Sequence, residues 1–310
     1  GSGLAVRYGD RKKNQGLSPK EIYKFVSDRI YGQDRAVKAA TMLLYNHIHA
    51  HKRNILFAGP TGCGKTEIWR VMSRLYPNIR IIDSTLLTMQ GWSGSFKVRD
   101  IFSSMSQEEA EKAIIVFDEF DKFCEPLYGS NGTNYGAAAQ NELLKLIEGG
   151  QIYFPADKGK PALELDSSGI SFVFCGSFER LTDVKTESES SMGFGNKIQK
   201  KDAYVQYEKE ITVEDLVRYA GIRQEIGGRI NQIVQLQGMT AEDYKKILQD
   251  KTISPLHQLE RQYGVKLRLG EREREKLAQE AERTKMGVRY LRSKIQQMLD
   301  EQLFQDDEQD

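Results

Sequence analysis

The chain has 310 residues, of which 39% are hydrophobic and 29% charged, a balance typical of a globular protein with about two domains. Lysine and arginine number 45 against 44 aspartate and glutamate, a net charge of +1, so the chain lacks the basic excess typical of sequence-independent nucleic-acid binders. No apolar run approaches the length of a membrane span, and the first residues show no charged-then-apolar pattern, so we expect neither a membrane span nor a secretory leader in this sequence. We expect residues 1–16 to be a tag or linker.

The three cysteines, Cys63, Cys124 and Cys175, lie far apart and form no C-x-x-C pair. This spacing argues against a disulfide framework and a zinc site and favours a reducing, cytoplasmic setting. His47 and His51 could face one side of a helix, but no carboxylate or cysteine follows at ligand spacing, so we interpret them as a polar helix end.

The first two helices are predicted from their ends and their apolar spacing. Ser18, Pro19 and Glu21 form a capping box with proline at the first helical position, which predicts a helix there. A second helix is expected from about Asp34 towards His51, because its apolar residues recur every three or four positions.

Short apolar runs then alternate with helix-forming stretches. Such runs are typical of strands buried on both faces of a parallel sheet, and the alternation predicts a doubly wound α/β domain with its ligand at the carboxyl edge of the sheet. The expected strands are Asn54–Ala58, Ile79–Ile82, Ala113–Phe117 and Ser171–Cys175.

The pattern changes near residues 236–240, and we expect the large domain to span residues 17–237. Residues 238–303 then form a small, mostly helical domain, with Thr240 as a helix cap, a short strand at Val265–Leu269 and two charge-rich helices at Glu271–Arg283 and Val288–Leu303. Residues 304–310 are expected to be an acidic tail.

A glycine-rich motif links the first expected strand to a helix. Backbone N–H groups cradle phosphates only where glycines allow tight turns, and the positive helix N-terminus adds to the attraction. In this motif the lysine would reach the terminal phosphates of ATP and the threonine would hold Mg²⁺. Its residues are Gly59, Pro60, Thr61, Gly62, Cys63, Gly64, Lys65 and Thr66.

A second apolar strand ends in two acids, Asp118 and Glu119. The strand would deliver Asp118 to the sheet edge beside the glycine-rich loop, where it can hold the Mg²⁺ shell. Glu119 would then orient and deprotonate the attacking water, which favours ATP hydrolysis over phosphoryl transfer to a small acceptor.

Segments around these motifs resemble the ClpX-type AAA+ unfoldases, in order and over nearly the whole length from Leu17 to Leu303. HslU shares the style of the glycine-rich loop, and Thr66-Glu67-Ile68 is closer to it, but HslU carries a large insertion for which this chain has no room. The matching segments are Ile30–Ala36, Tyr45–His47, Asp118–Lys122, Leu143–Gly149, Gly228-Arg229 and Gly287–Ser293.

The resemblance implies further nucleotide contacts. Arg229 matches the arginine that reaches the nucleotide of a neighbouring subunit, and Arg289 matches the sensor-2 arginine of the small domain. Ser177 falls at the sensor-1 position, while Ile30 and Tyr31 belong to the segment that packs against adenine; Glu67 directly follows the motif threonine. Cations that arrive only in an assembled ring make hydrolysis depend on assembly.

The resemblance also implies contacts with proteins. Gly91-Trp92-Ser93-Gly94 falls where the family has its aromatic pore loop, and residues Asn131–Tyr135 match the second pore loop, with Tyr135 as its only large side chain. Met192-Gly193-Phe194, within a polar loop at 182–201, resembles the loop that docks on the ClpP peptidase. Trp92 replaces the usual tyrosine.

Two features depart from the family. The sequence shows no counterpart of the four-cysteine, zinc-binding amino-terminal domain, which we expect either to have been removed or to be missing in nature. The loop between Phe154 and Leu165 lacks the Arg-Lys-His tag-recognition motif, although we expect Asp157–Lys160 to supply some positive charge. The expected function is a homo-oligomeric, hexameric ATPase that threads unfolded or tagged proteins into a ClpP-type peptidase. The alternatives are a nucleic-acid motor, a remodelling ATPase without a peptidase, and a nucleotide-gated scaffold.

Overall fold

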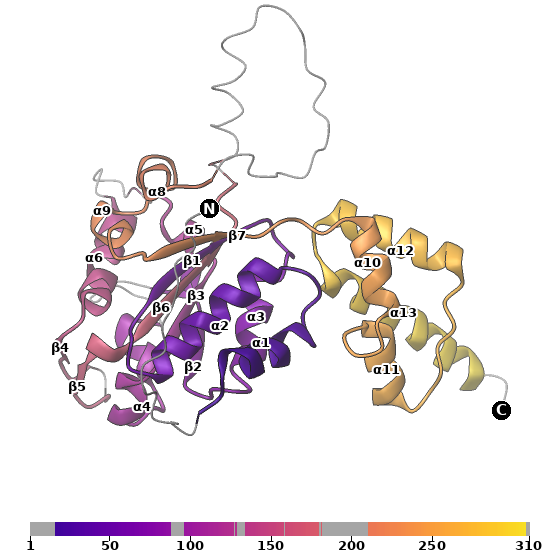
Figure 1. Ribbon diagram of the computed structural model, residues 1–310, viewed down its shortest axis with the longest axis horizontal. Helices are drawn as coiled ribbons and strands as arrows, with labels where there is room; N and C mark the ends of the chain where they lie inside the picture. The colour runs from indigo at the N-terminus through magenta and orange to yellow at the C-terminus, as the bar shows by residue number, and fades with distance from the viewer. Residues whose placement is uncertain are drawn as a thin grey trace, which may run out of the picture.

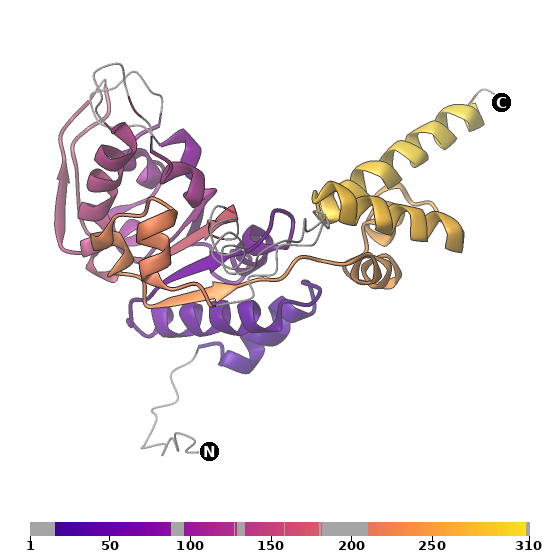
Figure 2. The ribbon, with the colours of Figure 1, turned by 90° about the horizontal axis from the view of Figure 1, so that it is seen from above.

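The chain folds into an α/β body followed by a body of helices. The computed structural model describes residues 16–87, 96–126, 128, 134–157, 159–179, 181 and 210–307. The segment that follows the last strand of the sheet leads across to the helical body (Figure 1). Seen from above in Figure 2, the two bodies are joined through this segment and meet near the end of the sheet.

A five-stranded parallel sheet forms the centre of the α/β body in the part of the chain described. Its order is β2-β3-β6-β1-β7, and every paired neighbour is parallel. Four strands confirm the sequence prediction: β1 (Asn54–Ala58), β2 (Ile79–Asp83), β3 (Ile114–Asp118) and β6 (Ser171–Gly176). The edge strand β7 (Gln232–Gln235) was not predicted, because glutamines at both of its ends interrupt the apolar run.

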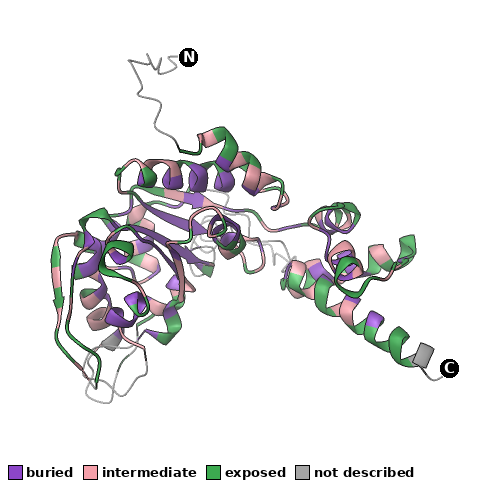
Figure 3. Cartoon of the chain, turned by 90° about the horizontal axis from the view of Figure 1, so that it is seen from below, coloured by how far each residue is buried: buried purple, intermediate pink, exposed green. Residues whose placement is uncertain are grey.

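Helices cover both faces of this sheet, which is the doubly wound arrangement that we expected. Alternate strand residues divide between two apolar clusters: Ile55 and Phe57 face one, Leu56 and Ala58 the other. The first cluster contains α1 (Pro19–Ser27), α2 (Asp34–Ile48) and α3 (Lys65–Met72). The second contains α4 (Gln107–Glu111), α5 (Phe120–Phe123), α6 (Tyr135–Glu148), α8 (Val213–Tyr219) and α9 (Gln224–Gly227). Figure 3 shows the buried strands between these layers.

The ends of the first two helices differ in how well the sequence predicts them. Ser18 and Glu21 make both hydrogen bonds of the capping box, and Pro19 opens α1 as expected. In contrast, α2 ends at Ile48 rather than near His51. Ala50 has φ 60°, in the left-handed region, and this turns the chain out of the helix towards β1.

An antiparallel pair, β4 (Gln151–Phe154) and β5 (Leu163–Asp166), lies outside the main sheet. Its connection is tied to the 3-10 turn Val98–Phe102, whose buried Arg99 donates to the carbonyls of Pro155 and Pro161. Lys160 Nζ lies 2.7 Å from Oδ1 of Asp100, whose side chain is only 7% exposed. Lys160 is therefore paired within the fold, whereas Lys158, the other lysine of the segment expected to supply positive charge, lies outside the described residues. Further 3-10 turns span Ser84–Leu86 and Ser167–Gly169.

The helical body, which we call the lid, has its own apolar cluster. Thr240 caps its first helix as predicted. Val265–Leu269, all of which the structure describes, is not the strand that we expected: no strand pairs with it, the Leu267 amide donates to Glu260, and Leu269 packs into the helical cluster. The helices are α10 (Ala241–Gln249), α11 (Pro255–Tyr263), α12 (Glu271–Thr284) and α13 (Val288–Asp307). None of the helices described combines the length and hydropathy of a membrane span.

Candidate functional site: a cavity between the sheet edge and the lid

A cavity of about 570 Å³ lies where the carboxyl ends of β1, β3 and β6 face the lid. This is the edge at which the sequence placed the ligand. Residues from both bodies line the cavity. The α/β body contributes Arg29, Ile30, Tyr31, Thr61, Gly62, Gly64, Lys65, Thr66, Glu67, Arg70, Asp118, Glu119, Gly176 and Ser177; the lid and its linker contribute Met239, Ile247, Ile253, Pro255, Gln258, Met286, Val288, Arg289 and Arg292.

The glycine-rich loop has the backbone that phosphate binding requires. Gly62 (φ 80°) and Gly64 (φ 99°) occupy left-handed conformations that other residues adopt only with strain. Gly64 also precedes α3, so no side chain caps the amides of the first turn of that helix. Uncapped N–H groups at a helix N-terminus attract anions.

Lys65 is held inside this loop. Its Nζ donates to the carbonyls of Gly59 and Pro60 at 2.6 and 2.9 Å. Only 8% of Lys65 is exposed. Gly59 and Pro60 thus contact the lysine rather than the cavity, and the neighbouring Cys63 is buried, which raises the pKa of its thiol. A phosphate entering the loop would therefore compete with two carbonyls for the ammonium.

Asp118, the last residue of β3, and Glu119, which follows it, both line the cavity. Glu119 has φ 54°, a strained value for a glutamate, and its N–H donates to Asp118 Oδ1 at 3.1 Å. Its carboxylate lies 2.8 Å from Lys122 Nζ, one turn further along. Strained backbone at a cavity wall is typical of functional sites, and it directs these neighbouring carboxylates to the same side of the sheet edge.

Asp121, which our sequence reasoning did not assign, anchors the end of β6. Its Oδ2 accepts hydrogen bonds from Ser177 Oγ (2.8 Å) and the Phe178 amide (3.2 Å). A Cβ at Gly176 would lie 2.6 Å from Asp121 Oδ1, so only glycine fits there. The signal available in the sequence was an acid three residues after Asp118. Ser177 lines the cavity, in an orientation that Asp121 fixes.

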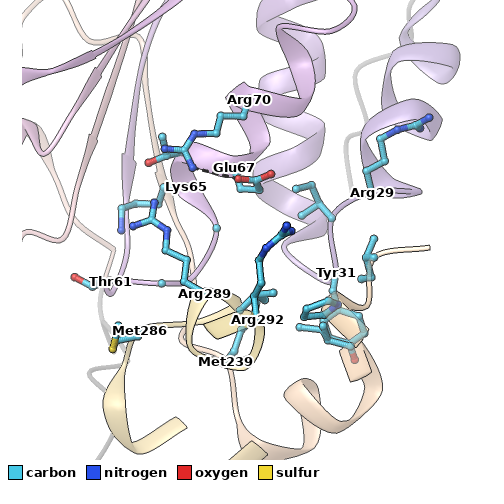
Figure 4. Close-up of a pocket in the computed structure, with 18 of the residues that line it drawn as sticks. Arg29, Tyr31, Thr61, Lys65, Glu67, Arg70, Met239, Met286, Arg289 and Arg292 are labelled. Atoms are coloured by element: carbon cyan, nitrogen blue, oxygen red, sulfur yellow. Dashed lines mark hydrogen bonds and ion pairs between the residues drawn. The ribbon is translucent and has the colours of Figure 1, made fainter. Parts of the chain in front are cut away.

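The lid approaches the phosphate loop through glycine. A Cβ at Gly287 would lie 2.5 Å from the carbonyl oxygen of Gly62, and Gly287 has φ 69°. This contact brings the start of α13 to the cavity, and Figure 4 shows Arg289 and Arg292 pointing into it. Arg292 was not predicted, although it stands three residues after Arg289 and so shares its helix face. Its Nη1 donates to Gln258 Oε1 at 3.1 Å.

The other end of the cavity is apolar. Ile30 and Tyr31 lie there with Met239, Ile247 and Ile253, and Tyr31 also packs against the lid cluster. A flat apolar base suits such a surface, whereas phosphates suit the loop end. Figure 4 shows Tyr31 on the side of the cavity away from Lys65.

One side chain connects the phosphate loop with the linker to the lid. Gln33 has a left-handed backbone (φ 57°). Its Nε2 donates to the carbonyl of Cys63 at 3.2 Å and to that of Gln237 at 2.8 Å. The loop and the linker therefore share one amide group.

Among the residues described, Arg229 stands apart from this cavity. It follows α9 and precedes β7, and its guanidinium Nη2 lies 3.0 Å from Glu148 Oε1. The two side chains are 44% and 46% exposed. Arg229 thus lies at the amino edge of the sheet, opposite the cavity of its own chain, and is accessible from outside.

The remaining expected contacts fall mostly outside the described residues. This holds for Gly91, Trp92, Ser93 and Gly94 and for Met192, Gly193 and Phe194. Of residues 131–135, the backbone of Asn134 and Tyr135 is described: Asn134 caps α6 through a bond from the Ala137 amide, and Tyr135 is the first residue of that helix.

Comparison with known proteins agrees with this geometry. Residues 55–181 match the family model "ATPase family associated with various cellular activities (AAA)", which spans the phosphate loop, Asp118, Glu119 and Ser177. The chain is also similar to the ATP-dependent Clp protease ATP-binding subunit ClpX of Treponema denticola, at 28% identity over 322 residues, covering 93% of this chain and 77% of that protein. The sheet, the lid, the cavity and these similarities support ATPase activity and are consistent with a ClpX-type AAA+ protein.

Proposed function

We propose that this ATPase is the subunit of a homo-oligomeric ring, a hexamer by resemblance, that unfolds proteins and threads them through its pore into a ClpP-type peptidase. One observation carries the proposal. The cavity holds Lys65, Asp118, Glu119 and Arg289, whereas Arg229 lies at the opposite edge of the sheet. A site that needs Arg229 can therefore be completed only by a second copy of the chain, as a heterologous, ring-forming contact allows.

The chain's own residues divide the chemistry of hydrolysis. Lys65 would exchange its bonds to Gly59 and Pro60 for the terminal phosphates. Glu119 would leave Lys122 and accept a proton from the attacking water, while Arg289 and a neighbour's Arg229 would stabilise the charge that develops on the phosphoryl oxygens. Thr66 and Asp118 offer the oxygen ligands that Mg²⁺ prefers. When bound, Mg²⁺ would neutralise phosphate charge.

The division of the chain into two domains supports the idea that ATP hydrolysis is coupled to movement of one domain against the other. We propose that residues 17–237 form the large domain and 238–303 the small domain, with the cavity between them. Two apolar clusters lie within the first range and a third largely within the second. Because both domains line the cavity, nucleotide turnover would change how they sit against each other.

The protein-facing part of the proposal rests on the family resemblance. Trp92 and Tyr135 would grip an extended chain through non-specific aromatic packing, and Met192 with Phe194 would dock on the peptidase. Lys160 is already paired with Asp100, so we do not assign substrate recognition to the connection between β4 and β5.

The test is ATPase activity with casein, with DNA and with neither. Stimulation by casein that is lost in Glu119→Gln, together with ATP-dependent loss of a folded fluorescent reporter, would support the unfoldase. Stimulation by DNA alone would reject it in favour of a nucleic-acid motor. An unstimulated, negligible turnover would favour a nucleotide-gated scaffold instead.

A further inference from the structure

A buried asparagine holds the backbone of Arg229. Asn54 is the first residue of β1 and is 4% exposed. Its Oδ1 accepts a hydrogen bond from the Phe172 amide at 3.1 Å, and its Nδ2 donates to the carbonyl of Arg229 at 3.0 Å. One carboxamide therefore joins the central strand β6 to the segment that carries the arginine.

The same segment is fixed from its other side. Asn231 Oδ1 accepts from the Asn54 amide at 2.8 Å, and the Asn231 amide donates to the Asn54 carbonyl at 2.8 Å. The Arg229 amide in turn donates to the carbonyl of Ile226, at the end of α9. The backbone on both sides of the Arg229 side chain is thus held against the sheet.

The side chain of Arg229, by comparison, is held at its tip, where its partner among the described residues is Glu148. Glu148 pairs with its guanidinium, and Lys52 adds a repelling charge: burial lowers the pKa of Lys52, and Arg229 lowers it further. Lys52 Nζ is occupied by the carbonyl of Ile147 at 3.0 Å. A rigid base with a half-exposed cation is the arrangement expected of a group that acts on another molecule.

We propose that Asn54 is a positioning residue that directs Arg229 towards the nucleotide of a neighbouring copy of the chain. This inference rests on the proposed function. The position requires one acceptor and one donor on the same short side chain, which asparagine supplies and aspartate or alanine does not. Asn54 lies a strand's length, roughly 16 Å at about 3.3 Å per residue, from the phosphate loop of its own subunit. Asn54 would therefore influence hydrolysis at the nucleotide site of the neighbouring subunit, rather than at the site of its own subunit.

The first experiment compares Asn54→Ala and Asn54→Asp with the unmodified chain. Both variants remove the donor to Arg229, and the second keeps the side-chain shape. We expect ring ATPase to fall on the order of 10- to 100-fold, as for other small misplacements of catalytic groups. Binding of a fluorescent ATP analogue to each subunit should stay within about twofold, because the subunit's own cavity is intact. Asn141→Ala, at an exposed asparagine on α6, is the matched control.

The second experiment mixes two inactive subunits in one ring. Asn54→Ala retains its own Glu119, and Glu119→Gln retains a correctly placed Arg229. An Asn54→Ala site next to a Glu119→Gln subunit therefore receives the arginine, and mixing should restore ATPase activity. A mixture of Arg229→Ala with Glu119→Gln serves as the reference, since it tests the action of Arg229 between subunits directly.

The outcomes separate this inference from the proposed function. Restoration in both mixtures supports the role of Asn54. Restoration in the reference alone, or loss of nucleotide binding in both Asn54 variants, overturns it and leaves Asn54 as a residue of folding. Failure of the reference mixture rejects the action of Arg229 across the ring, and the role of Asn54 with it.

Discussion

The two edges of the central sheet treat polar groups in opposite ways. At the carboxyl edge, Glu119 has a strained backbone, and Asp121 Oδ1 is buried without a hydrogen-bond partner in the part described. At the amino edge, buried polar side chains are paired: His47 contacts Ser171 Oγ at 2.9 Å and the Lys112 carbonyl at 3.0 Å, and Asn54 uses both ends of its amide.

This difference indicates a division of labour within one sheet. A strained catalytic candidate or an unpaired buried carboxylate oxygen costs free energy, and such groups are frequent near sites that bind a ligand. A fully bonded polar network instead fixes a single geometry. The carboxyl edge is therefore suited to binding and chemistry, and the amino edge to holding a group in place. The following variants test that contrast.

The largest effect is expected at Glu119. Glu119→Gln removes the proposed base but keeps the side-chain size, so hydrolysis should fall by roughly 10²- to 10⁴-fold while ATP still binds. Turnover and binding of a fluorescent ATP analogue measure the two properties. The control is Glu164→Gln, at an exposed glutamate on β5. Equal loss of binding and turnover would contradict a role in the chemical step.

The next effect concerns the contact between lid and loop. Gly287→Ala would place a methyl group 2.5 Å from the Gly62 carbonyl oxygen, so we expect ATP affinity to fall on the order of tenfold. Gly264→Ala is a close control, because Gly264 also has φ 69° but nothing lies within 4 Å of an added Cβ. If titrations gave both variants the same affinity, backbone strain rather than the lid contact would explain the loss.

A smaller effect is expected from His47 at the amino edge. Burial lowers the pKa of His47 despite its bond to the Lys112 carbonyl, so the folded state disfavours the proton. The stability that this provides is complete above the unfolded pKa of about 6.5 and is lost as pH falls through the folded pKa, by at most about 1.4 kcal/mol per pH unit. Urea unfolding from pH 8 to 5 should show this slope.

His47→Gln should remove that part of the pH dependence, whereas His51→Gln, at an exposed histidine, should keep it. An unchanged slope in His47→Gln would assign the acid sensitivity to other groups.

The smallest effect concerns Cys63. Burial raises the pKa of its thiol, so alkylation by iodoacetamide should be slow in the folded chain and fast in urea. Mass spectrometry of the peptide that contains Cys63 measures both rates. Rapid labelling without denaturant would show that the loop opens readily.

The carboxyl edge could be predicted from the sequence because its signals are local. The glycine-rich motif, and Asp118-Glu119 after an apolar run, each lie within a few residues. The amino edge could not be predicted, since Asn54 finds its partners 118 and 175 residues away. The prediction of a strand at Val265–Leu269 was wrong for another reason. Apolar residues alternate there because they pack onto helices, and the periodicity of a sequence alone does not distinguish such a segment from a strand.

The two hydrogen bonds of Gln33 have a thermodynamic consequence. Its amide is shared by the phosphate loop and the linker to the lid, so a change in either carbonyl alters the bond to the other. Linkage between two sites is reciprocal: the factor by which nucleotide alters the preference for one lid position equals the factor by which that position alters nucleotide affinity. Any neighbour that fixes the lid therefore also sets the affinity for nucleotide.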